Sequence, residues 1–137
     1  MACFLVPAAE AAVVTIAAHG LELAEQKKAQ RLTLSGDHTA ALAEENPLPW
    51  SRKLKWLTYL LWGGVLLLAF EHVWHGEVTP WFPFLTAASN PADMVEMFHE
   101  MATVGVTMAV IVTAVWGVLV ACATLLMKRS AGAELAR

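Results

Sequence analysis

Two long apolar stretches dominate the pattern of hydrophobic and polar positions along the chain. Leu57–Phe70 is almost entirely apolar, and with its flanks it runs from Lys55 to His75, which is about 30 Å of helix and one hydrocarbon thickness. Ala102–Met127 carries no charged side chain and ends at Lys128. These patterns predict membrane-spanning helices over residues 51–75 and 91–128.

A third apolar stretch, at the N-terminus, is less regular because Pro7, Glu10, His19 and Gly20 interrupt it. We predict a helix over residues 2–33, of which 2–23 span the membrane; the alternative is an amphipathic helix lying on the membrane surface. A polar loop over 34–50 and a short tail over 129–137 complete the chain. The predicted fold is therefore a single all-α integral membrane domain over 1–137, with three transmembrane helices, or two plus an interfacial N-terminal helix.

The composition supports a membrane protein. Hydrophobic residues make up 58% of the 137 residues and charged residues only 15%, and the mean hydropathy is +0.54. A soluble domain of this size needs more charge on its surface, so the apolar excess indicates the lipid bilayer as a partner. The net charge of -3, without a basic patch interleaved with aromatic residues, argues against nucleic-acid binding.

The positive charges are distributed very unevenly. All nine Lys and Arg lie either between residues 27 and 55 or between 128 and 137. Because cytoplasmic loops carry the excess of Lys and Arg, we expect a partly helical cytoplasmic loop, a cytoplasmic C-terminus and an outward-facing connection over 76–101. The expected location is the cell membrane (the inner membrane where a cell has two), with a multi-pass topology.

The outward-facing connection has two parts. Residues 76–90 include the aromatic, proline-rich run Pro80–Phe84, a composition typical of the headgroup boundary. Asn90-Pro91 then predicts a helix start, with Asn90 as the N-cap and Asp93 as an acidic residue near the positive end of the helix dipole.

Carboxylates and imidazoles gather near this side of the predicted bundle. Residues three or four apart on a helix share a face, so side chains from two facing helices could form a ligand set for Zn²⁺, Fe²⁺ or Mn²⁺. A haem held by a histidine pair ranks below a simple metal ion. A solvated polar rim at the helix ends is the alternative. The candidate metal ligands are Glu71, His72, His75, Glu96, His99 and Glu100.

Two carboxylates are expected to lie inside the apolar zone, where ionisable groups are costly and usually have a partner or a role. Glu71 should lie about one turn inside helix 51–75. Glu10 lies near mid-membrane if the first helix starts at Ala2, and in a first turn near the surface if the helix starts at Pro7. The sequence does not distinguish between these two depths of Glu10.

Small residues recur at every fourth position of the last helix, a pattern that lets another helix come close in lipid. The expected partner lies within the chain, for example at the notch formed by Gly63 and Gly64; a homo-oligomeric or heteromeric contact is the alternative. The helix-packing residues are Gly105, Ala109, Thr113, Gly117 and Ala121.

The sequence contains no recognised nucleophile, phosphate-loop, zinc-protease or c-type haem motif, so no catalytic residue is expected. Three functions remain. The first is a non-catalytic accessory or assembly subunit of a membrane complex. The second is a metal, proton or cation transport or metal-handling protein. The third is a redox component that binds haem, quinone or iron.

The charge distribution yields a test of topology. A reporter fused to the C-terminus should be cytoplasmic, and one inserted near Ala87 should be external, because no Lys or Arg lies between residues 56 and 127. Paired alkaline phosphatase and fluorescent protein fusions measure this directly. A cytoplasmic reporter at Ala87 would contradict the proposed orientation.

Overall fold

The computed structural model describes residues 2–35 and 48–135, and within these ranges it consists of helices together with a loop over 75–90 that contains a short 3-10 helix and an isolated β-bridge. The prediction of an all-α fold is therefore confirmed, and three helices are long and apolar enough to cross a membrane. The partly helical stretch expected in the first loop lies largely at 36–47, outside the described residues. The elements are α1 (Leu5–Leu34), α3 (Trp50–Trp74), the short 3-10 helix η1 (Thr86–Ser89), α4 (Pro91–Glu100), the π-helix η2 (Met101–Gly105) and α5 (Val106–Leu135).

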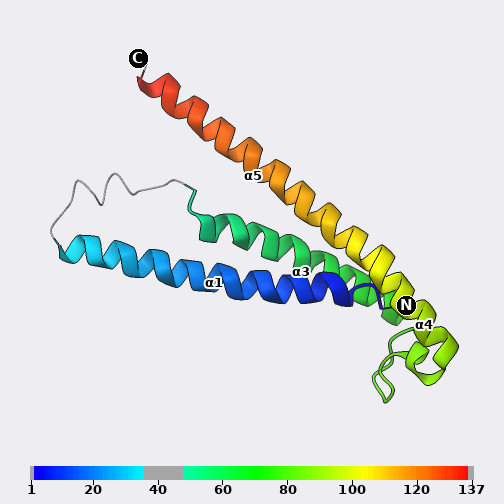
Figure 1. Ribbon diagram of the computed structural model, residues 1–137. Helices are drawn as coiled ribbons and strands as arrows, with labels where there is room; N and C mark the ends of the chain where they lie inside the picture. The colour runs from blue at the N-terminus through cyan, green and yellow to red at the C-terminus, as the bar shows by residue number, and fades with distance from the viewer. Residues whose placement is uncertain (1, 36–47, 136–137) are drawn as a thin grey trace.

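Helices α1 and α3 form an antiparallel pair (Figure 1). Their shared core contains Ala11, Leu57 and Leu61, with Val112 and Trp116 of α5 packed against it. Small Ala11 lets the larger leucines come close to the α1 backbone, which increases the number of dispersion contacts.

Polar contacts fix the register of this pair. The Trp62 indole donates a hydrogen bond to the Thr15 hydroxyl (3.1 Å). Nearer the end where α3 begins, Lys55 Nζ lies 2.7 Å from Glu22 Oε1, and the Ser51 hydroxyl donates to Glu25. We call this the charged end of the bundle, and the opposite end, where α4 lies, the α4 end.

The third long helix is continuous through α4, η2 and α5. Asn90 caps it as the sequence predicted: its side-chain oxygen accepts a hydrogen bond from the amide of Ala92 (3.1 Å), and Pro91 is the first helical residue. The helix continues to Leu135, beyond the end expected near residue 128. The expected tail over 129–137 contains alanines, a glutamate and a leucine, which favour helix, and it contains no proline; Gly132 alone does not end the helix.

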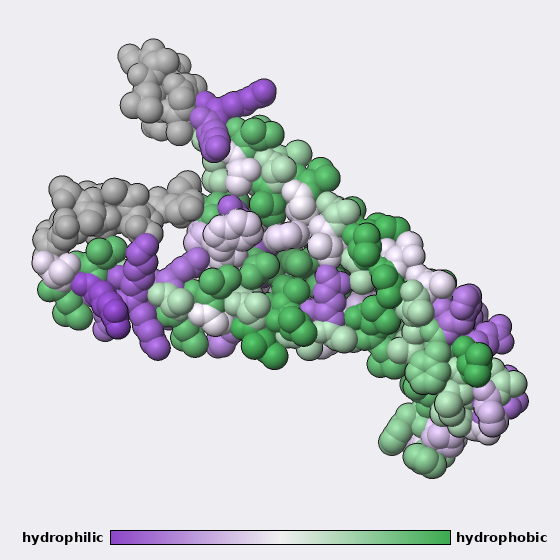
Figure 2. Space-filling model, viewed as in Figure 1, coloured by the Kyte–Doolittle hydropathy of each residue, from purple (hydrophilic) through white to green (hydrophobic). Residues whose placement is uncertain are grey.

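Helix α5 diverges from the α1–α3 pair toward its C-terminal end (Figure 1). The first half of α5 packs against the other helices through residues such as Ala109 and Trp116, as does Gly105 of η2 just before it. Apolar side chains cover the middle of the molecule, and the hydrophilic ones gather toward the ends (Figure 2).

Residues 71–77, with the sequence EHVWHGE, end α3 with a specific backbone motif. Gly76 adopts a positive φ of 72°, its amide donates to Val73 O, and the amide of Glu77 donates to His72 O. These two bonds form a Schellman motif, which satisfies the last carbonyls of a helix and favours glycine. Beyond it, Val78 pairs with Leu85 in an isolated antiparallel bridge, which holds an aromatic loop whose tip is exposed.

The N-terminal segment packs into the α4 end. Ala2 is fully buried against Ala87 and Met97. Helix α1 begins at Leu5 and has no acidic residue in its first turn, so Glu10 lies in the second turn. Neither of the two starts considered from the sequence, Ala2 or Pro7, describes this helix.

The ridge of small residues on α5 meets α1, and the expected notch on α3 is not its partner. A Cβ built on Gly105 would lie 2.8 Å from the carbonyl oxygen of Cys3, whereas one built on Gly63, Gly64 or Gly117 would meet nothing within 4 Å. The space beside Gly63 and Gly64, the notch given as an example of a partner within the chain, is therefore open.

The close approach at Gly105 yields a test of packing. Gly105→Ala should destabilise the protein by about 1–3 kcal/mol, because a backbone carbonyl must move to admit the methyl group. Gly64→Ala and Gly117→Ala are matched controls, and each should be neutral or stabilising by up to about 1 kcal/mol, since alanine favours helix and the space is open. Thermal unfolding in detergent, followed by circular dichroism, measures the stability of the three variants. Equal effects at all three positions would contradict the Gly105 contact.

Candidate functional site

Polar side chains line a cavity of about 310 Å³ at the α4 end. They come from the N-terminal segment, from the end of α3 and from the junction of α4 with η2. We call this the α4-end cavity; its lining residues are Cys3, Leu68, Glu71, His72, His75, Glu77, Glu100, Val104 and Met108.

His72 is the most deeply buried ionisable side chain of this cavity. It is buried, and its Nδ1 lies 2.7 Å from the Leu68 carbonyl oxygen. Because a carbonyl only accepts, Nδ1 carries a proton, and in the neutral form of the ring Nε2 is then the acceptor. Cys3 Sγ lies 3.4 Å from Nε2, so the thiol donates to it. Phe4 packs edge-on against the ring, with centroids 5.2 Å apart.

Glu77 lies on the same side of the imidazole, with Oε2 3.7 Å from His72 Nε2. Protonation of His72 would turn this contact into an ion pair and would remove the acceptor that the Cys3 thiol uses. The arrangement is a hydrogen-bonded thiol–imidazole pair with a carboxylate beside it.

Burial raises the pKa of the Cys3 thiol above its ordinary value, and the carboxylates of Glu100 and Glu71 raise it further. Thiolate is the nucleophilic and metal-binding form of cysteine. A thiol held neutral in this way acts as a hydrogen-bond donor and not as an activated nucleophile.

The six predicted metal ligands are not brought together. Glu71, His72, His75 and Glu100 line the α4-end cavity, but Glu96 and His99 are exposed on α4 and lie outside its lining. Among residues 2–35 and 48–135, no group of three or more His, Cys, Asp and Glu side chains is arranged to hold a metal ion. The physical reason is that α4 continues past the end of α3, so its first turns rise beyond the reach of His72 and His75.

The histidine pair required for a haem is likewise not assembled. His99 is exposed and lies outside the α4-end cavity, and both nitrogens of His72 already contact Leu68 and Cys3. The geometry thus agrees better with a hydrogen-bonded polar rim at the helix ends, the alternative that the sequence left open.

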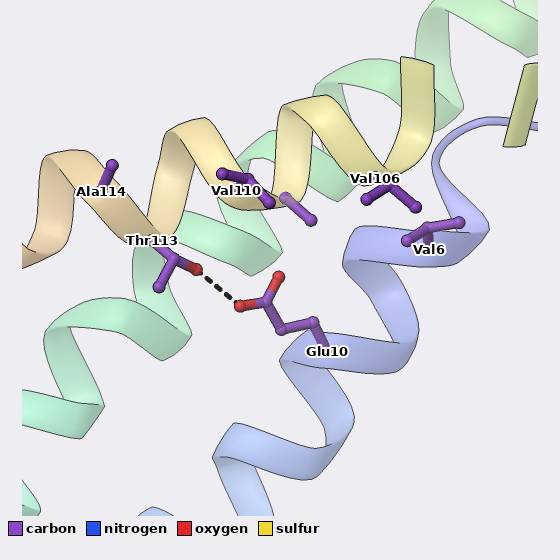
Figure 3. A pocket seen from close by; sticks show the side chains of 7 residues that line it. Val6, Glu10, Val106, Val110, Thr113 and Ala114 are labelled. Carbon is purple, nitrogen blue, oxygen red and sulfur yellow. Dashed lines mark hydrogen bonds between the residues drawn. The ribbon is translucent and has the colours of Figure 1, made fainter. Parts of the chain in front are cut away.

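The two predicted buried carboxylates differ. Glu71 is exposed at the edge of the α4-end cavity. Glu10 is partly buried, and its Oε1 accepts a hydrogen bond from the Thr113 hydroxyl at 2.6 Å. It lies in an open groove of about 510 Å³ between α1 and α5 (Figure 3). We call this the α1–α5 groove; its lining residues are Val6, Glu10, Val106, Ala109, Val110, Thr113 and Ala114.

Three participants in these sites were missed from the sequence. Cys3 belongs to no closely spaced Cys or His pair, and Phe4 and Glu77 carry no motif. Their contacts with His72 depend on tertiary packing of the N-terminal segment against α3. The pairing of Thr113 with Glu10 was also missed, although the four-residue spacing had placed Thr113 on the correct face.

No protein family, characterised protein or solved structure matches this chain.

The Cys3 environment yields a test in solution. In a Cys122→Ala variant, where Cys3 is the only thiol, alkylation by iodoacetamide should be severalfold slower in the folded protein than after unfolding in guanidinium chloride. The rate should also rise at higher pH when folded. Because folding raises this pKa, the neutral thiol stabilises the fold below the unfolded value, and that contribution is lost as pH rises through the folded value.

The rates should be compared from about pH 7 to about pH 10, which brackets an ordinary thiol pKa. If the alkylation rate of the folded protein rises at the same pH as that of the unfolded protein, or at a lower pH, the result would contradict a buried, neutral Cys3.

Proposed function

We propose that this protein is a non-catalytic accessory or assembly subunit of a membrane complex, with three spans, that binds a partner through the uncovered face of α5. The observation that carries the proposal is the state of α5: its most apolar 18-residue window has no residue buried inside the chain. An isolated chain leaves this helix largely alone in lipid.

The arrangement of the helices supports three spans. Lys55 and Glu22 pair at the charged end, and His72 contacts Cys3 at the α4 end; along α3, Lys55 and His72 are about 25 Å apart. This distance is close to one hydrocarbon thickness. Helix α1 covers the same depth as α3, which favours a spanning first helix over an interfacial one.

We further propose that the charged end faces the cytoplasm and the α4 end faces outward. Every Lys and Arg that the structure describes lies at or beyond the charged end or in the C-terminal part of α5. The tilt of α5 away from the pair in Figure 1 lets its longer apolar stretch fit the same hydrocarbon layer.

The uncovered face of α5 has the composition of a helix-packing surface. Gly117 and Ala121 continue the small-residue ridge beyond the part that contacts α1, and both are exposed. In lipid, such a groove gains stability only from van der Waals packing with another helix, because lipid tails are as apolar as the side chains. A transmembrane helix of a partner protein would provide this packing.

The transport and redox alternatives have weaker support. The α4-end cavity lies at one end of the bundle, and Glu10 lies on the outside of the bundle among apolar side chains. Among the described residues, these two polar places are not joined in one cavity.

The α5 face yields a test of the proposed function. Gly117→Leu and Ala121→Leu should lower the fraction of chain recovered in a larger complex from native membranes by about tenfold or more, because added side chains block close helix approach. Native electrophoresis of detergent extracts measures this fraction. Ile111→Leu and Val115→Leu, on the opposite face of α5, are the matched controls and should retain the complex.

Equal losses at both pairs of positions, or a chain that never enters a larger complex, would contradict the proposal.

A further inference from the structure

The carboxylate of Glu10 uses one of its oxygens within the chain. Oε1 accepts the hydrogen bond from Thr113, and in Figure 3 the second oxygen points away from Thr113 into the α1–α5 groove. The remaining groove lining consists of valine and alanine side chains. A carboxylate in lipid requires a counter-charge or a proton, since an unpaired charge there is strongly unfavourable.

Among the described residues, no Lys or Arg lies at the depth of Glu10. The Thr15–Trp62 hydrogen bond shows which residues of α1 and α3 share a level. From that level Lys55 lies seven residues toward the charged end and Glu10 five residues toward the α4 end, which separates them by about 18 Å along the helices. On α5, Lys128 lies about 22 Å from Thr113.

The groove is shaped for a helix. It is open along one side and is lined by small and β-branched residues of two neighbouring helices, α1 and α5. Gly117 and Ala121 extend the same face of α5, because they lie four and eight residues beyond Thr113. A helix lying here would cover Glu10 and the exposed small residues together.

A second copy of this chain does not supply the missing charge. A copy inserted in the same orientation would bring another Glu10 to this depth, and its Lys and Arg would lie at the far end. Two carboxylates facing each other in lipid repel. Charge complementarity therefore selects a different chain.

We infer that the α1–α5 groove binds a transmembrane helix of another protein, and that this helix carries a Lys or Arg that pairs with Glu10. The inference rests on the proposed function, in which α5 binds a partner span, and it adds the chemistry of that span. The cation contacts the free oxygen of Glu10 while Thr113 holds the other. The partner's basic residue lies about two turns inside the α4 end.

Site-specific photo-crosslinking tests the inference in native membranes. A benzophenone amino acid replaces Ala114, which lines the groove, in the full-length tagged chain; Ile111, exposed outside the groove, is the control position. After irradiation, the crosslinked peptide is sequenced by mass spectrometry. The expected product at residue 114 is a membrane span of another protein that contains Lys or Arg, with at least tenfold less of it from residue 111.

Charge reversal then tests the pairing. Glu10→Lys should reduce the crosslink at residue 114 at least tenfold, and exchanging the partner's basic residue for Glu should restore it. Helix content and thermal unfolding of Glu10→Lys and Glu10→Gln are measured in parallel; where a variant does not fold, the sequence of the wild-type crosslinked peptide decides.

The inference is overturned by a crosslinked span without Lys or Arg, by crosslinking only to lipid or to a second copy, or by no crosslink. It is also overturned if a folded Glu10→Lys variant crosslinks as well as the wild type. If Gly117→Leu disrupts the complex while Glu10 is dispensable, the proposed function stands and only the charge pairing fails.

Discussion

The contact between the Cys3 carbonyl and Gly105 sets the arrangement of the rest of the structure. Because Gly105 has no Cβ, the start of α1 lies against the backbone of η2, with Val6 also in contact. About two turns further along both helices, this register brings Glu10 to Thr113. On the other side, it places the Cys3 thiol against His72. The packing at one glycine thus determines the arrangement of side chains in both the α1–α5 groove and the α4-end cavity.

The helices themselves follow from local rules that the sequence displays. Long apolar runs between charged flanks predict α3 and α5, and the Asn90-Pro91 pair predicts where α4 begins; the structure has both features. The sequence did not predict which helix packs against the small-residue ridge. Spacing shows which face of a helix allows close approach, but Gly63-Gly64 and α1 were both possible neighbours, and only tertiary packing distinguishes them.

The candidate site was predicted in part for a similar reason. Residues on one helix face can be listed from periodicity, and Glu71, His72 and His75 at the end of α3 do line one cavity. Whether α4 lies beside or beyond them depends on how far each helix extends, and α4 continues past the end of α3. Cys3 escaped notice because its partner is 69 residues away. The polar rim at the α4 end is held together by hydrogen bonds. The helix surface that the described chain leaves uncovered lies on α5.

Lipid accessibility along α5 tests the existence of a covering partner most directly. A lipid with a photoactivatable diazirine in its acyl chain labels the lipid-facing residues of the unmodified chain, and mass spectrometry of the α5 peptides locates the label. In the purified chain in nanodiscs, Val110, Ala114, Gly117 and Ala121 should be labelled as strongly as Val115. In complexes isolated from native membranes and placed in the same lipid, the four should be protected while Val115 stays labelled. Equal labelling at all five positions in those complexes would contradict a partner helix on this face.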